Sequence, residues 1–312
     1  MRPGSASETA RRLLVAAAFV ALGVAAHAQT EATLDVLDGE TLYEDGWLIT
    51  LGTEFDEKDE LQSGWHSVPD PADTERRRRE TVLAAHYGLR NDLQLSWLLP
   101  QVRTVEESTV GGVTTRTTAE GWGDAVALLK WRFHRWDAPH QALNMALLAG
   151  AELPTGDDRE KDDGVLVPSE LQPASGSLDP MLGVAATYEP GRWRFNAAAL
   201  YTRPSEAHDH QDGDELFLEL AAGNRFWLEP YPGPFMRFDL ILRHRHQGRD
   251  HQDGALDHDT GGDLTTLGAN LAFRPRPSLD FQVGVETPVA EQVEGTQLAA
   301  GTALVFNLGY RF

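Results

Sequence analysis

The chain has 312 residues, no cysteine, and 48 acidic against 27 basic side chains, which gives a formal net charge of -21. So acidic a chain excludes nucleic acid as a partner, because binding to a phosphate backbone depends on Lys and Arg. The absence of cysteine excludes disulfides and thiolate metal sites.

The N-terminus predicts a cleaved export signal at residues 1–28. Basic residues precede an unbroken run of small and apolar residues from Leu13 to Ala26. Ala26-His27-Ala28 then provides the small-x-small pattern that signal peptidase accepts. The run is too short for a helical membrane anchor, which needs roughly 20 apolar residues.

From residue 46 onward, the chain alternates apolar with polar or small residues at a period of two, which predicts β-strands. Near the C-terminus, Leu304, Phe306 and Leu308 fall on one face, while Val305 and Asn307 fall on the other. Twelve strands are predicted, at 46–55, 79–89, 92–103, 122–134, 142–153, 178–189, 192–203, 214–228, 235–247, 263–274, 278–288 and 296–312.

The connections between the predicted strands alternate strictly between short and long. Five short connections carry Gly, Pro, Asn or Asp, the residues that turns require. Six longer, acidic connections fall near 56–78, 104–121, 154–177, 204–213, 248–262 and 289–295. Bacterial outer-membrane barrels combine short periplasmic turns with long outer loops. The sequence therefore predicts an all-β fold over residues 46–312, a transmembrane, antiparallel, up-and-down β-barrel of about 12 strands with a polar lumen.

The alternation of short and long connections places both ends of the chain in the periplasm. Residues 29–45 are therefore predicted to form a periplasmic N-terminal segment. Leu34, Val36 and Leu37 are too few apolar residues to decide whether the stretch 31–45 enters the lumen as a plug. A soluble β-sandwich would also alternate, but it does not account for the long-short rhythm.

Aromatic residues near the short connections fall on the outward-facing side of their predicted strands. Amphipathic rings form such a girdle at the headgroup level of a membrane barrel. The predicted girdle residues are Tyr87, Phe133, Tyr188, Trp193, Phe273, Phe281, Tyr310 and Phe312.

The C-terminus has a polar-x-Gly-aromatic-x-aromatic pattern, formed by Asn307, Gly309, Tyr310 and Phe312. This pattern resembles the signal by which the outer-membrane assembly machinery recognises the last strand. Together with the export signal, it predicts the outer membrane of a Gram-negative cell as the location. The expected partners there are membrane lipids, lipopolysaccharide and the assembly machinery.

Short motifs follow one another in a fixed order along the chain. They are Glu120-Gly121-Trp122-Gly123-Asp124, Lys130-Trp131, Glu152-Leu153-Pro154-Thr155-Gly156 and Asp179. In order and spacing they resemble the outer-membrane transporter family named for the meta-pathway of phenol degradation, over most of the mature chain. The resemblance implies a barrel that moves small, often aromatic compounds. Taken residue by residue, the same motifs are more typical of strand ends and loop turns than of contacts with a solute.

The inward phase of the predicted strands carries charges of both signs. Opposed charges on facing strands could line a selective pore or could pair and fill the lumen, and the sequence does not choose between them. The pore-lining candidates are Lys130, Arg132, Glu152, Arg194, Glu219, Arg225, Arg237, Asp239, Arg243 and Glu286, with Glu54, His86, Asp124, Asp179 and Asn270 in the same phase.

Two neighbouring outer loops are rich in both histidine and aspartate. Imidazole with carboxylate suits zinc, copper or nickel, whereas carboxylates alone suit calcium. His208, His210, His251 and His258 are the candidate ligands of a divalent cation. No spacing of a known metal site is present, and a solvated acidic loop is the alternative.

We predict a passive channel for uptake or efflux of small solutes, which the family resemblance suggests are aromatic. The alternative is a non-conducting surface barrel whose acidic loops bind divalent metal ions. An enzyme is not favoured, because His86 and His134 lie near the periplasmic side and the His66-Ser67 pair lies in a loop. The sequence also carries no phosphate-binding glycine loop or zincin motif, and no cofactor is expected.

Overall fold

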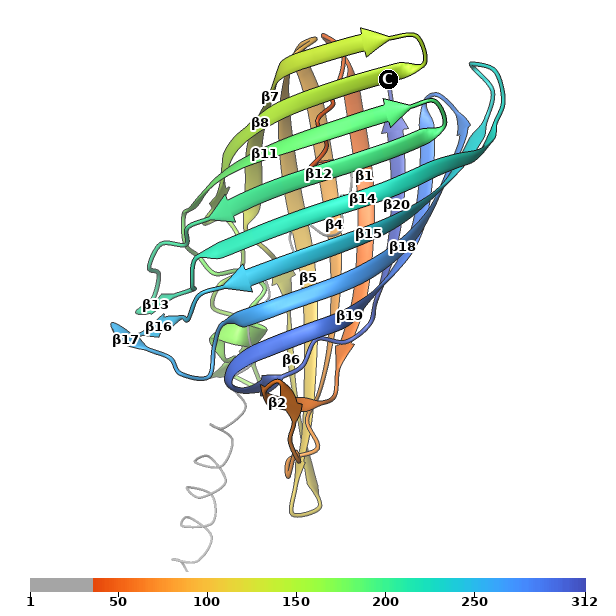
Figure 1. Ribbon diagram of the computed structural model, residues 1–312. Helices are drawn as coiled ribbons and strands as arrows, with labels where there is room; N and C mark the ends of the chain where they lie inside the picture. The colour runs from red at the N-terminus through yellow and green to blue at the C-terminus, as the bar shows by residue number, and fades with distance from the viewer. Residues whose placement is uncertain (1–35) are drawn as a thin grey trace, which may run out of the picture.

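The computed structural model describes residues 36–312, and the predicted signal peptide lies outside this range. Twelve long strands form one antiparallel sheet that closes on itself, as the periodicity predicts (Figure 1). The first strand closes the barrel by pairing with the last. Closure leaves no unpaired edge, which a sheet in hydrocarbon requires. The barrel strands are β1 (Trp47–Lys58), β4 (Glu75–Arg90), β5 (Leu93–Val110), β7 (Ala125–Ala138), β8 (Gln141–Leu153), β11 (Asp179–Pro190), β12 (Trp193–Thr202), β14 (Glu215–Leu228), β15 (Phe235–Gln247), β18 (Gly262–Arg276), β19 (Leu279–Leu298) and β20 (Ala303–Arg311).

The short turns lie at one end of the barrel, together with the C-terminus, and the long connections lie at the other (Figure 1). This is the arrangement that the connection lengths predict. Short elements occur within the long connections: β2 (Leu61–Gly64), β3 (His66–Ser67), β6 (Val113–Trp122), β9 (Lys161–Asp162), β10 (Val165–Leu166), the 3-10 helix η1 (Ser169–Leu171), β13 (His210–Gln211), β16 (His251–Gln252) and β17 (Ala255–Leu256).

Two segments predicted as loops are sheet instead. The stretch 104–121 is the outer part of β5 and most of β6, which pair as far as Val110 and Val113. Strand β19 runs on through 289–295, and the last strand begins at Ala303 rather than at residue 296. Beyond the membrane both faces of a strand are wet, so the alternation that marks a strand in the sequence is lost while the backbone ladder continues.

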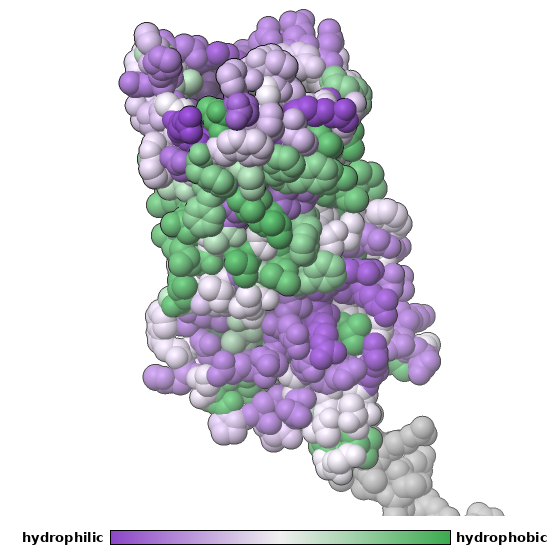
Figure 2. Space-filling model, turned by 90° about the vertical axis from the view of Figure 1, so that its right-hand side faces the viewer, coloured by the Kyte–Doolittle hydropathy of each residue, from purple (hydrophilic) through white to green (hydrophobic). Residues whose placement is uncertain are grey.

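The outer surface carries an apolar band between two polar ends (Figure 2). Leucines in the outward phase, such as Leu182 and Leu220, have exposed fractions of 65% and 57%. Such exposure of large apolar side chains is what a lipid-facing surface requires. The predicted girdle residues Trp193 and Tyr310 also lie on this outer face. Among the residues from 36 to 312, no helix is long and apolar enough to cross a membrane.

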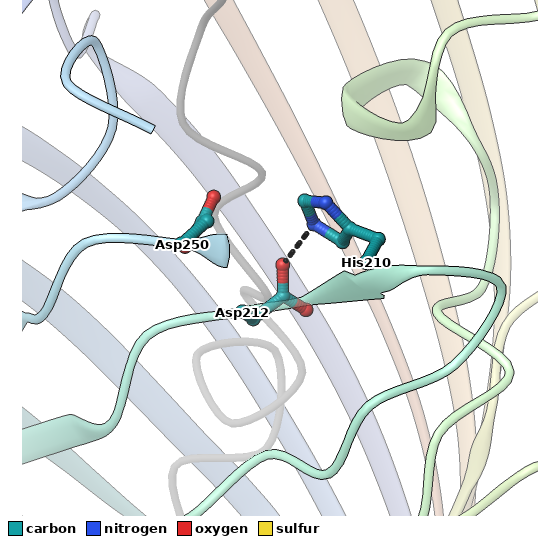
Figure 3. Close-up of side chains that lie close together, drawn as sticks. All are labelled: His210, Asp212 and Asp250. Carbon is teal, nitrogen blue, oxygen red and sulfur yellow. Dashed lines mark hydrogen bonds and ion pairs between the residues drawn. The ribbon is translucent and has the colours of Figure 1, made fainter. Parts of the chain in front are cut away.

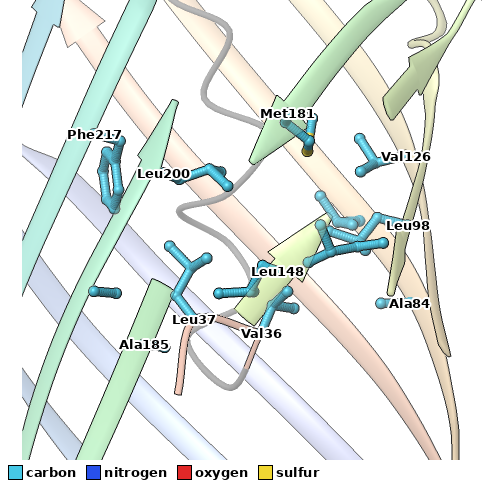
Figure 4. Close-up of a cluster of buried hydrophobic side chains, with 13 residues drawn as sticks. Val36, Leu37, Ala84, Leu98, Val126, Leu148, Met181, Ala185, Leu200 and Phe217 are labelled. Atoms are coloured by element: carbon cyan, nitrogen blue, oxygen red, sulfur yellow. The ribbon is translucent and has the colours of Figure 1, made fainter. Parts of the chain in front are cut away.

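The inner wall is apolar in part, which corrects the expectation of a uniformly polar lumen. Strands β4, β5, β7 and β8 each contain a short stretch that is apolar in both phases, namely 82–85, 97–100, 125–129 and 145–149. The inward members form one cluster with residues of β11, β12, β14 and the N-terminal segment (Figure 4). The cluster consists of Val36, Leu37, Val82, Ala84, Leu98, Val126, Leu128, Leu148, Met181, Ala185, Ala198, Leu200 and Phe217.

Candidate functional site: a lumen covered at both ends

Residues 36–45, which we call the N-terminal segment, begin in the interior of the barrel and end at its exposed rim. Val36 and Leu37 are buried against the apolar part of the inner wall (Figure 4). Asn196 on β12 donates a hydrogen bond from Nδ2 to the Leu37 carbonyl oxygen at 3.1 Å. The Gly39 N–H donates to Thr187 Oγ1 on β11 at 2.9 Å. The segment is therefore attached to the wall by both apolar and polar contacts.

Charged side chains hold the middle of the N-terminal segment. Lys130 Nζ lies 2.6 Å from Asp38 Oδ1, and Arg194 lies 2.9 Å from Asp38 Oδ2 and 2.6 Å from a Glu40 carboxylate oxygen. The Lys130 side chain is only 1% exposed. An unpaired ion in so dry a place is strongly unfavourable, so the opposed charges stabilise the segment in position. We call Asp38, Glu40, Lys130 and Arg194 the lumen clamp.

The N-terminal segment reaches the end of the barrel that carries the short turns. There the Asp45 N–H donates to the Gly88 carbonyl oxygen at 2.8 Å. A Cβ atom on Gly88 would lie 1.9 Å from the Tyr43 carbonyl oxygen, so only glycine lets the segment pass this close to β4. Residues 36–42 thus lie within the barrel. The sequence predicted a periplasmic segment at 29–45 and left open whether the stretch 31–45 enters the lumen. The sequence does not predict this position, because individual contacts with residues far away in the chain hold the segment. A periodic apolar face, which sequence patterns can detect, is not involved.

Several other charges of the inner wall form ion pairs, either within one strand or between strands that are one or two positions apart in the sheet. Arg243 contacts both Glu219, at 3.1 Å, and Glu286, while Glu189 accepts hydrogen bonds from Arg194 and Arg225. Arg237 pairs with Asp239 at 2.8 Å. These predicted candidates therefore lie on the inner wall as neutralised pairs. Whether they line a conducting pore stays a prediction.

Asp124 ties the outer loop 154–177 to the barrel. Its Oδ1 accepts the backbone N–H groups of Thr155 and Gly156, both at 2.8 Å. Its Oδ2 accepts those of Ser175, at 3.0 Å, and Gly176, at 2.9 Å. Asp124 is wholly buried. The Gly-Asp and Leu-Pro-Thr-Gly motifs thus meet here, and the contacts that they make are structural.

The loop 154–177 covers part of the outer end of the lumen, on the side of β5 and β6. Leu171 of η1 and Val167 are buried against Ala119 of β6. Gln172 Nε2 donates to the Val167 carbonyl oxygen at 2.8 Å. On β11, Asp179 Oδ1 accepts hydrogen bonds from Ser177 Oγ, at 2.6 Å, and from the Ser205 N–H, at 3.0 Å. The predicted lumen residue Asp179 therefore links this loop to the next outer loop.

A small cavity remains between the N-terminal segment and the outer loops. About 50 Å³ of it can hold the centres of water-sized molecules, which suffices for a few waters and not for a ring compound. The charged side chains of its lining are acidic. Its apolar lining includes Val36, Leu98, Val126, Leu128, Met181 and Leu200, and its carboxylates belong to Glu152, Asp179, Asp212 and Glu215.

Of the four histidines predicted as metal ligands, the part of the chain from residue 36 brings one into a cluster with two carboxylates. His210 lies beside Asp212 and Asp250 (Figure 3). Its hydrogen bond to Asp212 raises its pKa to about 9, although burial acts in the opposite direction. His208 instead pairs with Asp158 at 2.7 Å, and His251 and His258 lie outside the cluster.

A histidine–serine pair, which the sequence analysis did not find, lies inside the barrel. His86 Nδ1 and Ser96 Oγ are 2.8 Å apart on the neighbouring strands β4 and β5. Ser96 also accepts a hydrogen bond from Gln94 Nε2 at 3.2 Å. Both His86 and Ser96 are buried, so lipid and solute have no route to the hydroxyl in this arrangement.

A closed antiparallel barrel with an apolar outer face is the fold of an outer-membrane β-barrel. The protein is located in the outer membrane of a Gram-negative cell. The family model described as "Putative MetA-pathway of phenol degradation" matches residues 72–304, and the chain belongs to this family. That range contains all the motifs that carry the resemblance in the sequence.

Solved structures of outer-membrane proteins share the fold. The COG4313 outer membrane channel from Pseudomonas putida F1 is 17% identical with a TM-score of 0.67, over 88% of this chain and 98% of that one. The transport unit of the autotransporter AIDA-I from Escherichia coli is 10% identical with a TM-score of 0.50, over 90% of this chain and 95% of that one. No curated protein matches the sequence.

Proposed function

We propose that the protein is a passive outer-membrane channel for small, largely apolar solutes, and that the N-terminal segment closes it. Withdrawal of this segment toward the periplasm would join the outer cavity to the periplasmic end of the lumen. The carrying observation is the position of residues 36–42, which occupy the lumen without belonging to the sheet. The twelve paired strands would keep their backbone hydrogen bonds when the segment leaves.

The lining of the lumen supports the class of solute. Once Val36 and Leu37 leave, the inner wall that they cover would present Leu98, Val126 and Leu128 to the passage. Apolar walls with a few polar groups are typical of sites that bind small organic molecules. The description of the family refers to a pathway of phenol degradation, and phenol is an aromatic compound. This supports aromatic compounds as the solutes.

Conductance in a planar bilayer tests the channel and its closure together. The wild-type barrel should conduct rarely, and a variant without residues 29–42 should form a steady open pore. A neutral aromatic alcohol should reduce the current of this variant reversibly, and a sugar of similar size should not. The matched control replaces residues 107–116, at the tip of the β5–β6 hairpin, by an Asn-Gly turn. This control should behave like the wild type, because the hairpin lies outside the lumen.

Two outcomes would contradict the proposal. If the folded deletion variant stays as silent as the wild type, the barrel is not a channel closed by this segment. If the wild type conducts as well as the deletion variant, the barrel is a channel but the N-terminal segment does not close it.

A further inference from the structure

Two outer loops lie side by side beyond β12 and β15. The first, residues 203–214, contains β13, and the second, residues 248–261, contains β16 and β17. Strands β13 and β16 pair antiparallel, with His210 opposite Gln252. The Gly248 N–H also donates to the Asp214 carbonyl oxygen at 2.9 Å. The two loops therefore have a defined relative position.

Three potential metal ligands converge where these loops meet. His210 and Asp212 come from the first loop and Asp250 from the second, and one ligand atom of each lies within 4.8 Å of the others (Figure 3). Asp212 and Asp250 are buried, with exposed fractions of 7% and 3%, and the His210 side chain is 23% exposed. Two buried carboxylates this close together are stabilised by a cation or a proton between them.

Neighbouring groups already orient the ligands. His210 Nε2 faces Asp212 Oδ1 at 2.9 Å, and its other ring nitrogen, Nδ1, lies 3.0 Å from Gln252 Oε1. Because Gln252 Oε1 can only accept a hydrogen bond, it fixes the proton on Nδ1 and leaves Nε2 to face the carboxylates. Histidines that bind metals are held in this way, by a hydrogen bond from the second ring nitrogen to a carbonyl or carboxylate oxygen. On the other side, Asp250 Oδ1 accepts the Gly213 N–H at 2.8 Å.

One imidazole and two carboxylates are a ligand set of the zinc type, and calcium would require six or more oxygen ligands. In a tetrahedral zinc site the ligand atoms lie about 3.4 Å apart, given metal–ligand distances near 2.1 Å. The longest separation, at most 4.8 Å, would therefore contract by up to roughly 1.4 Å, and the 2.9 Å between His210 Nε2 and Asp212 Oδ1 would widen by roughly 0.5 Å. Side-chain rotations within the loops can provide both changes. Three protein ligands leave a fourth position for water.

We propose that His210, Asp212 and Asp250 bind one divalent transition-metal ion of the zinc type, and that this ion joins the two outer loops. The ion takes the place of the imidazolium proton between His210 Nε2 and Asp212. The site lies beside the cavity, since Asp212 and Gly213 belong to the cavity lining. The proposal is independent of whether the barrel conducts.

Calorimetric titration of Zn²⁺ into the refolded, chelator-treated barrel in detergent tests the site. We expect one ion per chain, and Co²⁺ bound at the same place should give the absorption of a tetrahedral complex. His210→Gln and Asp250→Asn should each weaken zinc binding at least 30-fold, and Gln252→Ala, which removes only the orienting group, by about tenfold. The matched controls are His251→Gln, on the paired strand, and His208→Gln, in the same loop, and both should bind zinc like the wild type.

Heat-dependent migration on gels shows that each variant has kept its barrel fold. Absence of zinc binding by the wild type at millimolar zinc would overturn the proposal. Equal affinity of His210→Gln and His251→Gln would overturn it as well, because zinc would then bind to scattered loop histidines.

Discussion

The two covers of the lumen differ in how they are held. The N-terminal segment is held mainly by side chains, namely the lumen clamp, the apolar contacts of Val36 and Leu37, and hydrogen bonds with Thr187 and Asn196. One backbone hydrogen bond, from Asp45 to Gly88, joins it to β4 at the rim. The loop 154–177 is held by backbone N–H groups that converge on the single buried carboxylate of Asp124.

The difference indicates which cover can move. When the loop 154–177 leaves, buried backbone donors lose their acceptor, which is strongly unfavourable. When the N-terminal segment leaves, water can enter the lumen and solvate the charges of the clamp. We therefore expect the segment to be the movable cover and the loop to be a fixed part of the barrel.

The largest effect should come from Asp124→Ala, which removes the acceptor of four backbone N–H groups in the loop 154–177. Each buried donor left without a partner costs roughly 1–3 kcal/mol, so we expect the loop to lose more than about 3 kcal/mol and to detach. Limited proteolysis within the loop should then be faster by a factor on the order of 100. Asp157→Ala is the control, since Asp157 accepts one such bond, from the Trp122 N–H at 2.7 Å. Equal sensitivity of the two variants would mean that Asp124 is not the main anchor.

A smaller effect is expected at the other cover. Asp38→Ala removes the carboxylate that contacts both Lys130 and Arg194. Removal of one partner of a buried ion pair costs about 3 kcal/mol, and the open time of the pore should rise by a factor on the order of 100. Single-channel recording measures this change. Glu44→Ala, at the exposed rim, should leave the open time unaltered, and a similar increase in both variants would show that the clamp does not hold the segment.

The barrel itself could be predicted from the sequence because the membrane imposes a local rule. Along a strand such as β15, every second residue meets lipid, so Phe238, Leu240 and Leu242 alternate with residues that face the lumen. The difference between short and long connections is equally local. Strand number, phase and orientation therefore follow from residues that are neighbours in the sequence.

The contents of the lumen could not be predicted, because they depend on residues far apart in the chain. Asp38 and Lys130 are separated by 92 positions. The family motif suggested Asp124 as a strand end, but not that loop residues 31 to 52 positions away would converge on it. The apolar runs in β4 and β7 do indicate that something apolar fills part of the lumen. An inner wall that faced only water would not require inward apolar side chains such as Val82 and Val126.

Leu37→Ala tests the apolar half of the contact that holds the N-terminal segment. Leu37 is 3% exposed within the apolar cluster. Truncation of a buried leucine costs at least about 2 kcal/mol, so the open time should rise roughly 30-fold, less than for Asp38→Ala. Leu37→Met conserves the volume and should cost under about 1 kcal/mol. An equal response to the two substitutions would show that packing of Leu37 does not hold the segment.

The smallest effect concerns the metal-free outer loops, where Asp212 raises the pKa of His210 from 6.5 to about 9. Because the pKa is higher in the folded loop than in the unfolded chain, the imidazolium stabilises the loop fully below pH 6.5, and this stabilisation is lost as the pH rises through about 9. The loop 203–214 should therefore become more sensitive to protease between these pH values, with the rest of the barrel unaltered. NMR titration of the His210 ring measures the pKa directly. In Asp212→Asn the neutral amide keeps a hydrogen bond but removes the charge, so the pKa should fall back toward 6.5 and the pH dependence of cleavage should disappear. A pKa near 9 that persists in this variant would mean that Asp250, and not Asp212, stabilises the imidazolium.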